Sequence, residues 1–254
     1  MKFDSSAFRL DGRTAIVTGA GAGIGRAIAE LFAAAGASVV VSDLDGDAAG
    51  EVADGIAAAG GVAVGVACDV TNEAALTALV DRARDAYGGI DVLVNNAGGG
   101  GPKPFDMPMA DFEWAYRLNV FSAFRLTQLC AAHMPAGGAV LAISSMAGEN
   151  TNAKMASYAS SKAAVNHLVR NIAYDLGPRG IRVNAIAPGA IKTHALSTVL
   201  TPEIETAMLA RTPLGRLGKA DDIAYAALFL CAPASEWVSG QVLTVSGGGV
   251  QELD

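Results

Sequence analysis

The sequence contains few cysteines and no long apolar run. Cys68, Cys130 and Cys231 are its only cysteines among 254 residues, and none of them belongs to a CxxC pair. Three cysteines this far apart indicate small buried side chains rather than a disulfide framework or a zinc site, so we expect no metal. No run reaches the roughly 18 apolar residues of a membrane span, and residues 1–11 lack the apolar core of a signal peptide. We therefore expect a cytoplasmic protein that does not enter a membrane.

The sequence is also poor in charge, and acidic residues outnumber basic ones. Charged residues make up 17% of the chain, and the formal net charge is -7. A nucleic-acid partner requires a clustered basic face that neutralises phosphates, so this balance argues against one. Hydrophobic residues make up 52% of the chain, and 30 residues are glycine. This composition is typical of one large α/β domain, which we expect to span residues 1–254.

Short apolar stretches alternate with helical patterns along the whole chain. Short unbroken apolar runs are typical of parallel strands that are buried on both faces. We predict a Rossmann-like, doubly wound parallel sheet of about seven strands with helices on both faces. The expected strands are 14–18, 38–43, 62–67, 91–94, 139–143, 181–187 and 241–245. The expected helices are one that ends at residue 35 and others at 47–59, 72–87, 111–134, 156–176 and 221–231.

A glycine-rich turn follows the first predicted strand. Residues 18–25 read Thr-Gly-Ala-Gly-Ala-Gly-Ile-Gly, so Gly19, Gly23 and Gly25 lie between a strand and a helix. Such glycines let a pyrophosphate approach the helix N-terminus, where free N–H groups favour an anion. Asp43 ends the second strand, where a carboxylate can accept hydrogen bonds from both ribose hydroxyls and would repel a 2′-phosphate. The sequence therefore favours NAD over NADP.

Three other residues bear on this nucleotide site. Arg26 could oppose the preference for NAD, but on the first turn of the helix we expect it to face solvent. Asp69 and Val70 end the third strand, where they would flank the adenine. The alternative is that Asp69 only caps the strand end. Asn96 lies in the sequence Asn-Asn-Ala-Gly at the end of the fourth strand, at the crevice where doubly wound sheets bind ligands.

Tyr158 and Lys162 are candidates for acid–base chemistry. Residues four apart share one face of a helix, so these two side chains point the same way. An ammonium near a phenol favours the phenolate and lowers its pKa, although a Lys beside a half-buried ring is also a common structural pair. Ser144 and Ser145 end the fifth strand, and the pattern alone does not choose which hydroxyl meets Tyr158. Asn119 lies inside a predicted helix, where it has a buried polar role or is merely tolerated.

These motifs together resemble those of the short-chain dehydrogenases/reductases. The resemblance rests on residues 18–25 and 95–98, on Ser145, on Tyr-Ala-Ser-Ser-Lys at 158–162 and on Pro-Gly-Ala-Ile-Lys-Thr at 188–193, and it covers nearly the whole chain. In that family the serine lies thirteen residues before the tyrosine, which selects Ser145. The family implies a homotetramer built on the helices at 111–134 and 156–176.

The family's roles carry over residue by residue. As a phenolate, Tyr158 would take the proton of an alcohol, Lys162 would lower its pKa and hold the nicotinamide ribose, and Ser145 would orient the substrate oxygen. Asn119 would support the water that relays the proton. The implied cofactor-binding residues are Gly19, Gly23, Ile24, Gly25, Asp43, Leu44, Asp69, Val70, Asn96, Tyr158, Lys162, Ile191, Lys192 and Thr193.

A narrower resemblance is to the NAD-dependent hydroxysteroid dehydrogenases of this family, and it rests on residues 98–112 and 245–253. It implies oxidation of the 7α-hydroxyl of bile acids, with Gly100 and Asn150 against the sterol beside Ser145 and Tyr158. The nearest alternative is a 3-oxoacyl-carrier-protein reductase, which ordinarily uses NADP. A non-catalytic dinucleotide-binding scaffold is the alternative from another class.

Residues 190–216 mix apolar and polar side chains without a clear period. They predict a mobile lid over an apolar pocket or, alternatively, a helical hairpin on the surface. A steroid requires a mostly apolar pocket with a few polar groups, so we expect five lining residues, Met146, Ile191, Leu196, Val199 and Met208. A bile acid also has an anionic tail that the net negative charge of the protein repels. We expect Lys192 or Arg211 to offset this repulsion.

Overall fold

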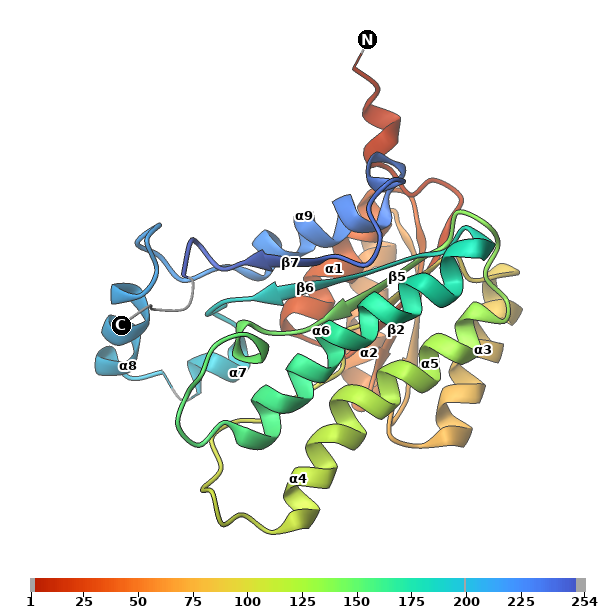
Figure 1. Ribbon diagram of the computed structural model, residues 1–254. Coiled ribbons are helices and arrows are strands. Elements are labelled where there is room, and N and C mark those ends of the chain that lie inside the picture. Colours follow the sequence, from red (N-terminus) through yellow and green to blue (C-terminus); the bar gives the residue numbers. More distant parts are fainter. Residues whose placement is uncertain (1–2, 199, 250–254) are drawn as a thin grey trace.

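The computed structural model describes residues 3–198 and 200–249, and its centre is a parallel sheet (Figure 1). Seven strands pair in the order β3-β2-β1-β4-β5-β6-β7. The strands are β1 (Thr14–Thr18), β2 (Ser38–Asp43), β3 (Val62–Ala67), β4 (Val92–Asn95), β5 (Ala139–Ile143), β6 (Arg182–Pro188) and β7 (Val242–Val245). The predicted doubly wound parallel sheet is confirmed, and each strand lies within one residue of its expected bounds.

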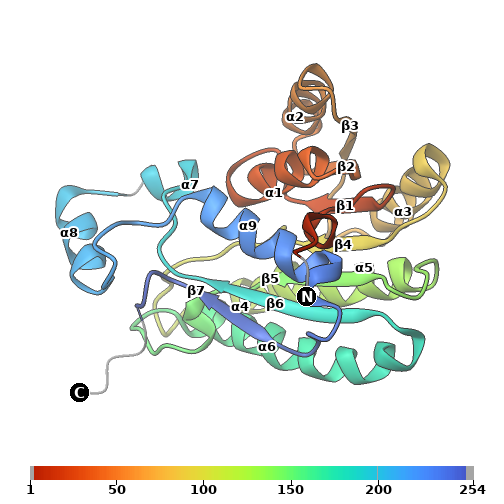
Figure 2. The same ribbon diagram turned by 90° about the horizontal axis from the view of Figure 1, so that it is seen from above.

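Helices cover both faces of the sheet, as Figures 1 and 2 show. On one face lie α1, α2 and α9, and on the other lie α3, α4, α5 and α6. Short helices α7 and α8 lie beyond the sheet, past the carboxyl ends of its strands (Figure 1). The helices are α1 (Gly23–Ala34), α2 (Gly46–Ala58), α3 (Glu73–Tyr87), α4 (Met109–Tyr116), α5 (Ser122–Ala131), α6 (Ala156–Leu176), α7 (His194–Ser197), α8 (Pro202–Ala210) and α9 (Ala220–Cys231).

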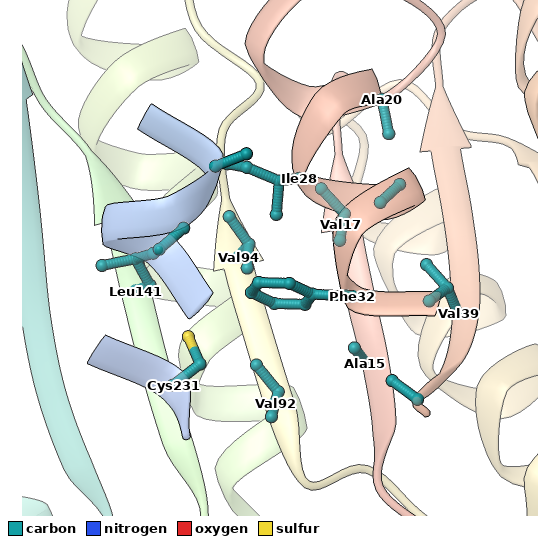
Figure 3. Close-up of a cluster of buried hydrophobic side chains, with 14 of the residues drawn as sticks. Ala15, Val17, Ala20, Ile28, Phe32, Val39, Val92, Val94, Leu141 and Cys231 are labelled. Carbon is teal, nitrogen blue, oxygen red and sulfur yellow. The ribbon is translucent and has the colours of Figure 1, made fainter. Parts of the chain in front are cut away.

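The core between the sheet and α1 is built around one aromatic ring. Phe32 of α1 is fully buried, and it lies among Val17 of β1, Val94 of β4 and Ile28 of its own helix (Figure 3). Removing a side chain of this size from water stabilises a fold by about 2–3 kcal/mol. Cys231 of α9 belongs to the same cluster, and all three cysteines are free and buried, as predicted.

The structure differs from the sequence-based prediction at two elements. Strand β3 was predicted to be buried on both faces, but Val62 at its start is 51% exposed, because β3 is an edge strand with only β2 beside it. The single helix predicted over 111–134 is instead α4 and α5, joined by a π-helical turn at Arg117–Phe121. A π turn widens the helix locally, and such turns are frequent at functional sites.

The strand order reverses between β1 and β4, and this fixes where a ligand can lie. In open parallel sheets, ligands bind at the carboxyl ends of the strands beside such a reversal. The glycine-rich turn, Asp43, Asn96 and Ser145 all follow carboxyl ends of strands in this sheet. Within residues 3–198 and 200–249, no helix combines the length and the apolarity that crossing a bilayer requires.

Candidate active site

Asn96 ties the ends of β1 and β4 together at the strand-order reversal. Its side-chain Nδ2 donates to the carbonyls of Thr18 and Gly19, both at 2.9 Å. The Thr18 hydroxyl accepts in turn from the backbone N–H groups of Asn96 at 3.1 Å and Ala97 at 3.0 Å. These bonds satisfy polar groups that the crevice would otherwise leave unpaired, so the crevice is rigid before any ligand enters.

The glycine-rich turn brings the N-terminus of α1 to this crevice. A Cβ at Gly25 would collide with the Gly19 carbonyl oxygen, so only glycine lets the helix pack this closely on the turn. The N-cap residue of α1 is Ala22, whose methyl cannot satisfy the first N–H groups, whereas Asp45 and Asn72 cap α2 and α3. An uncapped helix N-terminus on a glycine turn fits the pyrophosphate of a dinucleotide.

Two backbone hydrogen bonds hold the Asp43 carboxylate at the end of β2. Its Oδ2 accepts from the Gly21 N–H at 2.8 Å, and its Oδ1 accepts from the Asp45 N–H at 3.1 Å. A cavity of about 320 Å³ opens beside it, between the carboxyl ends of β1, β2, β3 and β4. This cavity is lined by Gly19, Asp43, Leu44, Cys68, Asp69, Val70, Asn96, Ala97, Gly98 and Leu118. A crevice with a carboxylate at this strand end fits NAD.

The other residues that the sequence brings into question at the nucleotide site lie in different surroundings. Arg26 is 54% exposed and pairs with Glu30 at 2.8 Å, so it faces solvent as predicted. Asp69 accepts from the N–H and hydroxyl of Thr71, and therefore closes the turn after β3 as well as lining the cavity. Ile24, at the start of α1, packs against the core.

Thr193 lies beside the glycine-rich turn although 168 residues of sequence separate it from Gly25. A Cβ at Gly23 would lie 3.4 Å from the Thr193 Cγ2, so these two residues are neighbours. Ile191 is buried against Gly218, and the Lys192 N–H donates to the Gly218 carbonyl at 2.8 Å. The segment 191–193 is therefore held beside the glycine-rich turn.

Tyr158 and Ser145 meet at the end of β5. Burial raises the pKa of the Tyr158 phenol, and a hydrogen bond with the Ser145 hydroxyl partly opposes this rise. The net direction is upward, which is opposite to the lowering predicted from sequence. The physical reason is that the pocket removes water from the phenolate, a cost that sequence spacing does not reveal.

The side chains of Ser144 and Ser145 point to opposite sides of the strand end. The Ser144 hydroxyl is buried and donates to the backbone carbonyl of Lys162 at 3.2 Å. Ser145 instead points to the other side of the strand end, where it lines a cavity and meets Tyr158. Neighbouring residues of an extended chain face opposite ways, so only one of the two can reach the phenol.

Lys162 lies close to the Tyr158 ring but is bonded elsewhere. Its Nζ is 5.8 Å from the centre of the ring, and it donates to the Ile143 carbonyl at 2.9 Å. The side chain is buried, and this burial lowers the pKa of the ammonium to about 8. The ammonium thus lies on the same helix face as the phenol, as predicted.

Asn119 is buried in the π turn, and its amide makes three hydrogen bonds. Its Oδ1 accepts from the Gly99 N–H at 3.0 Å, and its Nδ2 donates to the Gly99 carbonyl at 2.9 Å and to the Ser161 hydroxyl at 3.0 Å. The wider turn directs this amide toward the loop after β4 and toward α6. The Asn119 amide therefore has a structural role as a buried hydrogen-bonding group, and the residue is not merely tolerated in the helix.

A cavity of about 660 Å³ opens next to Ser145, and it is more polar than predicted. Met146 and Met208 line it as expected, but Ile191 and Leu196 do not, and Val199 lies outside the described residues. Its lining consists of Ser145, Met146, Ala147, Asn150, Thr151, Asn152, Ala153, Pro188, Gly189, Ala190, Met208, Arg211, Thr212, Ser246 and Gly249. The cavity lining includes polar residues because loops form most of its wall, and the pattern of apolar residues in the sequence does not describe loops.

Of the two predicted bases, only Arg211 lines this cavity. Lys192 is 55% exposed, and its ammonium lies 3.4 Å from a Glu205 oxygen of α8. Residues 190–216 contain two short helices, α7 and α8, which agrees with the helical alternative for this segment.

Comparisons with known proteins agree with this geometry. A family model described as enoyl-(acyl carrier protein) reductase matches residues 19–249. The 7alpha-hydroxysteroid dehydrogenase of Escherichia coli (strain K12) is 64% identical over 254 residues, covering 99% of this chain and 100% of that protein. The 3-oxoacyl-[acyl-carrier-protein] reductase of Vibrio cholerae is 37% identical over 243 residues, covering 94% of this chain and 98% of that protein.

A solved structure extends this likeness to three dimensions. The structure of 7 alpha-hydroxysteroid dehydrogenase complexed with NADH and 7-oxo glycochenodeoxycholic acid superimposes with a TM-score of 0.97. It is 64% identical in sequence, and the match covers 100% of both chains. This chain belongs to the short-chain dehydrogenase/reductase family.

Sequence reasoning missed several residues of this short-chain dehydrogenase/reductase site. The sequence places Thr18 at a strand end and in the glycine-rich motif but assigns it no role of its own, although a threonine beside a glycine turn is a signal for backbone hydrogen bonding. Thr212 and Ser246 line the larger cavity, and nothing in their local sequence indicates it, because the fold brings them together from distant segments. Gly98 lies close to Lys162 and Asn119, a packing relationship that only the structure shows.

Proposed function

We propose that this chain is an NAD-dependent 7α-hydroxysteroid dehydrogenase that reversibly oxidises the 7α-hydroxyl of bile acids to a ketone. The observation that carries this function is the 64% identity, over the full length, to a protein of that activity. The 660 Å³ cavity beside Ser145 and the crevice beside Asp43 give the two sites such a reaction requires, one for a steroid and one for the dinucleotide.

Proton transfer is the task of Tyr158. When bound, NAD supplies the hydride acceptor for the carbinol carbon. Ser145 donates a hydrogen bond to the substrate oxygen and fixes it beside the phenol. Tyr158, as the phenolate, then takes the hydroxyl proton, and burial makes its oxygen a strong base for this purpose. In the reverse direction the protonated phenol is the general acid.

Lys162 and Asn119 support this step. The Lys162 ammonium, 5.8 Å from the ring centre, favours the phenolate form and can reach the nicotinamide ribose. Asn119 holds the Gly99 backbone and the Ser161 hydroxyl beside the same side chains, in the position from which a proton-relay water would be supported. Residues 191–193, beside the glycine-rich turn, would hold the nicotinamide carboxamide.

The cavity wall suggests how a bile acid is oriented. Asn150 lines the cavity, as does Arg211, and their polar groups suit the hydroxylated face and the anionic tail of such a substrate. Gly100 lies against the Tyr158 ring. Replacing Arg211 with Gln should raise the KM for a conjugated bile acid and flatten its dependence on salt, while the KM for the uncharged methyl ester stays unchanged. Equal effects on both substrates would contradict this role.

The function is tested with a panel of hydroxysteroids that carry hydroxyls at ring positions 3, 7 and 12, each with NAD and with NADP. We expect NADH formation to be fastest with a 7α-hydroxy bile acid and NAD, and to be absent with the 7β epimer. Tyr158→Phe should lower kcat by about 10²- to 10⁴-fold while the Kd for NAD stays the same.

The rival enzyme reduces a 3-oxoacyl thioester with NADPH, so an acetoacetyl thioester is added to the panel. Faster turnover of the thioester than of the bile acid would overturn the proposal. Turnover that survives Tyr158→Phe undiminished would refute the acid–base role, and binding of NAD without any turnover would support the scaffold alternative.

Assembly and location are part of the same proposal. We infer a homotetramer in the cytoplasm, in which residues 1–254 form one domain. The face of α4 and α5 exposes Met109, Trp114, Phe121 and Phe124, an apolar surface that a second subunit would cover. Three free, buried cysteines suit a reducing compartment. Sedimentation as a monomer would contradict the assembly.

A further inference from the structure

Gly100 lies with its bare backbone against the Tyr158 ring. Its φ is +139°, a value that side-chain-bearing residues rarely adopt. A Cβ at this position would lie 2.6 Å from the Tyr158 Cδ2 and 3.2 Å from both its Cβ and its Cγ. Carbon atoms in contact are normally about 3.5–4.0 Å apart, so any side chain here would push the ring away.

A closed set of contacts holds Gly100 in that position. Asn119 binds both backbone polar groups of Gly99, through its Oδ1 at 3.0 Å and its Nδ2 at 2.9 Å. The same Nδ2 donates to the Ser161 hydroxyl at 3.0 Å, and that hydroxyl donates to the Tyr158 carbonyl at 2.7 Å. The loop after β4 is therefore attached to the backbone of Tyr158 through Asn119 and Ser161, while Gly100 touches the ring itself.

The phenol is confined from two directions as a result. Ser145, at the end of β5, meets the hydroxyl, and Gly100, on the loop after β4, contacts the ring. The side chain at Tyr158 has only two soft torsions, so a contact near Cγ and Cδ2 determines where its oxygen lies. A displacement of about 1 Å at a reacting group lowers rates by about 100-fold.

We propose that Gly100 is a positioning residue, which fixes the Tyr158 ring so that the phenol oxygen stays aligned with Ser145 and the substrate. This inference rests on the proposed oxidoreductase function, and it assigns Gly100 to the tyrosine rather than to the sterol. Asn119 and Ser161 act through the same contacts, because they hold the loop and the helix backbone at a fixed separation.

The first test is kinetic and uses Gly100→Ala. We expect kcat for the 7α-hydroxy bile acid to fall by about 100-fold, while KM for the steroid and Kd for NAD change by less than about twofold. Gly101→Ala is the matched control, because a Cβ there meets no atom within 4 Å, and it should leave kcat unchanged. An unchanged kcat in Gly100→Ala overturns the proposal. A raised KM with a normal kcat would also overturn it, because that result would indicate a contact with the substrate. An equal loss of kcat in Gly101→Ala would overturn it as well.

The second test is independent of turnover, because the positive φ could by itself disturb the loop. Thermal unfolding is measured for Gly100→Ala, Tyr158→Ala and the double variant. Backbone strain, and the 3.2 Å approach to the Cβ that alanine retains at position 158, cost the same with or without the ring. The 2.6 Å collision with Cδ2 disappears when the ring is removed. We expect Gly100→Ala to lower Tm much less in the Tyr158→Ala background than in the wild type. Equal lowering of Tm in both backgrounds would overturn the proposal that Gly100 positions the ring. This measurement does not depend on which substrate the enzyme uses.

Discussion

The Lys162 ammonium lies 5.8 Å from the centre of the Tyr158 ring, and its hydrogen bond goes to the Ile143 carbonyl at 2.9 Å. The lysine is therefore anchored to the end of β5 and not to the phenol. The strand thereby fixes where the ammonium lies relative to the ring. The side chain that lowers the pKa of the Tyr158 phenol as a hydrogen-bonding partner is Ser145 and not Lys162.

Ser145→Ala should shift the pH dependence of oxidation toward higher pH. The hydrogen bond with Ser145 lowers the pKa of Tyr158 against the rise that burial causes, so its loss raises that pKa further. Because oxidation requires the phenolate, the rising limb of the kcat profile moves to higher pH. We also expect kcat to fall by about 10²- to 10³-fold, because a donor to the reacting oxygen is lost.

Ser144→Ala is the matched control for this measurement. The Ser144 hydroxyl donates to the Lys162 carbonyl and does not line the cavity. Its removal should leave the midpoint of the pH profile where it is. An equal shift in both variants would show that the effect comes from general loosening of the strand end.

Lys162→Met should inactivate the enzyme and yet stabilise its fold near neutral pH. Burial lowers the pKa of Lys162 to about 8, against about 10.4 in an unfolded chain. The folded state therefore disfavours the ammonium, by about 3 kcal/mol below pH 8, and this penalty vanishes as pH rises to about 10.4. Loss of the hydrogen bond leaves the buried Ile143 carbonyl unpaired, which offsets about 1–3 kcal/mol of this gain.

The measurement is urea unfolding of both proteins at pH 7 and at pH 10.5. We expect Lys162→Met to be more stable than the wild type by up to about 2 kcal/mol at pH 7, and to be less stable than the wild type at pH 10.5. Lys103→Met, which removes an ammonium from an exposed pair with Asp111, should change stability by less than about 1 kcal/mol at either pH. Destabilisation of Lys162→Met at pH 7 would contradict the burial penalty.

Asp43→Asn should relax the preference for NAD. The amide keeps an oxygen that can accept from the Gly21 N–H, as Asp43 does at 2.8 Å, but it removes the negative charge beside the ribose site. The ratio of kcat/KM for NADP to that for NAD should rise by about tenfold or more, because a 2′-phosphate no longer meets a like charge. The comparison is made with Asp47→Asn, on the exposed first turn of α2. A ratio that stays constant in Asp43→Asn would remove Asp43 from cofactor selection.

Two glycines on different helices should respond in opposite ways to alanine. Gly55 lies inside α2, where an added methyl group would meet no atom within 4 Å, so Gly55→Ala should raise the free energy of unfolding by about 0.5–1 kcal/mol. Gly25→Ala places a methyl against the Gly19 carbonyl and should lower both stability and NAD affinity. Calorimetry and NAD titration of the two variants check this. A Gly25→Ala enzyme with normal NAD affinity would contradict the tight approach of α1 to the turn.

The fold was predictable because its signals are local. Strand β1 is a run of five buried residues between loops, and α6 begins and ends where its apolar period begins and ends. The π turn at Arg117–Phe121 was not predictable, since its periodicity hardly differs from that of the flanking helix. Its cause is tertiary, because the Asn119 amide bonds Gly99 and Ser161 on two other segments.

The candidate site was predictable in part. Tyr158, Lys162, Asp43 and the glycine turn follow from spacing within one helix or one βαβ unit. The polar lining of the larger cavity was not predictable, since Arg211 and Asn150 reach it from loops whose course no local pattern sets.

The sequence alone determined the order of strands and helices, the glycine turn that admits a dinucleotide and the helix face shared by Tyr158 and Lys162. Each of these depends on residues a few positions apart, whose geometry the backbone period fixes. The tertiary structure alone decided that burial raises the pKa of Tyr158 and that Gly100 contacts its ring. These outcomes depend on which distant segments exclude water from a side chain and touch it, and only the folded chain sets that.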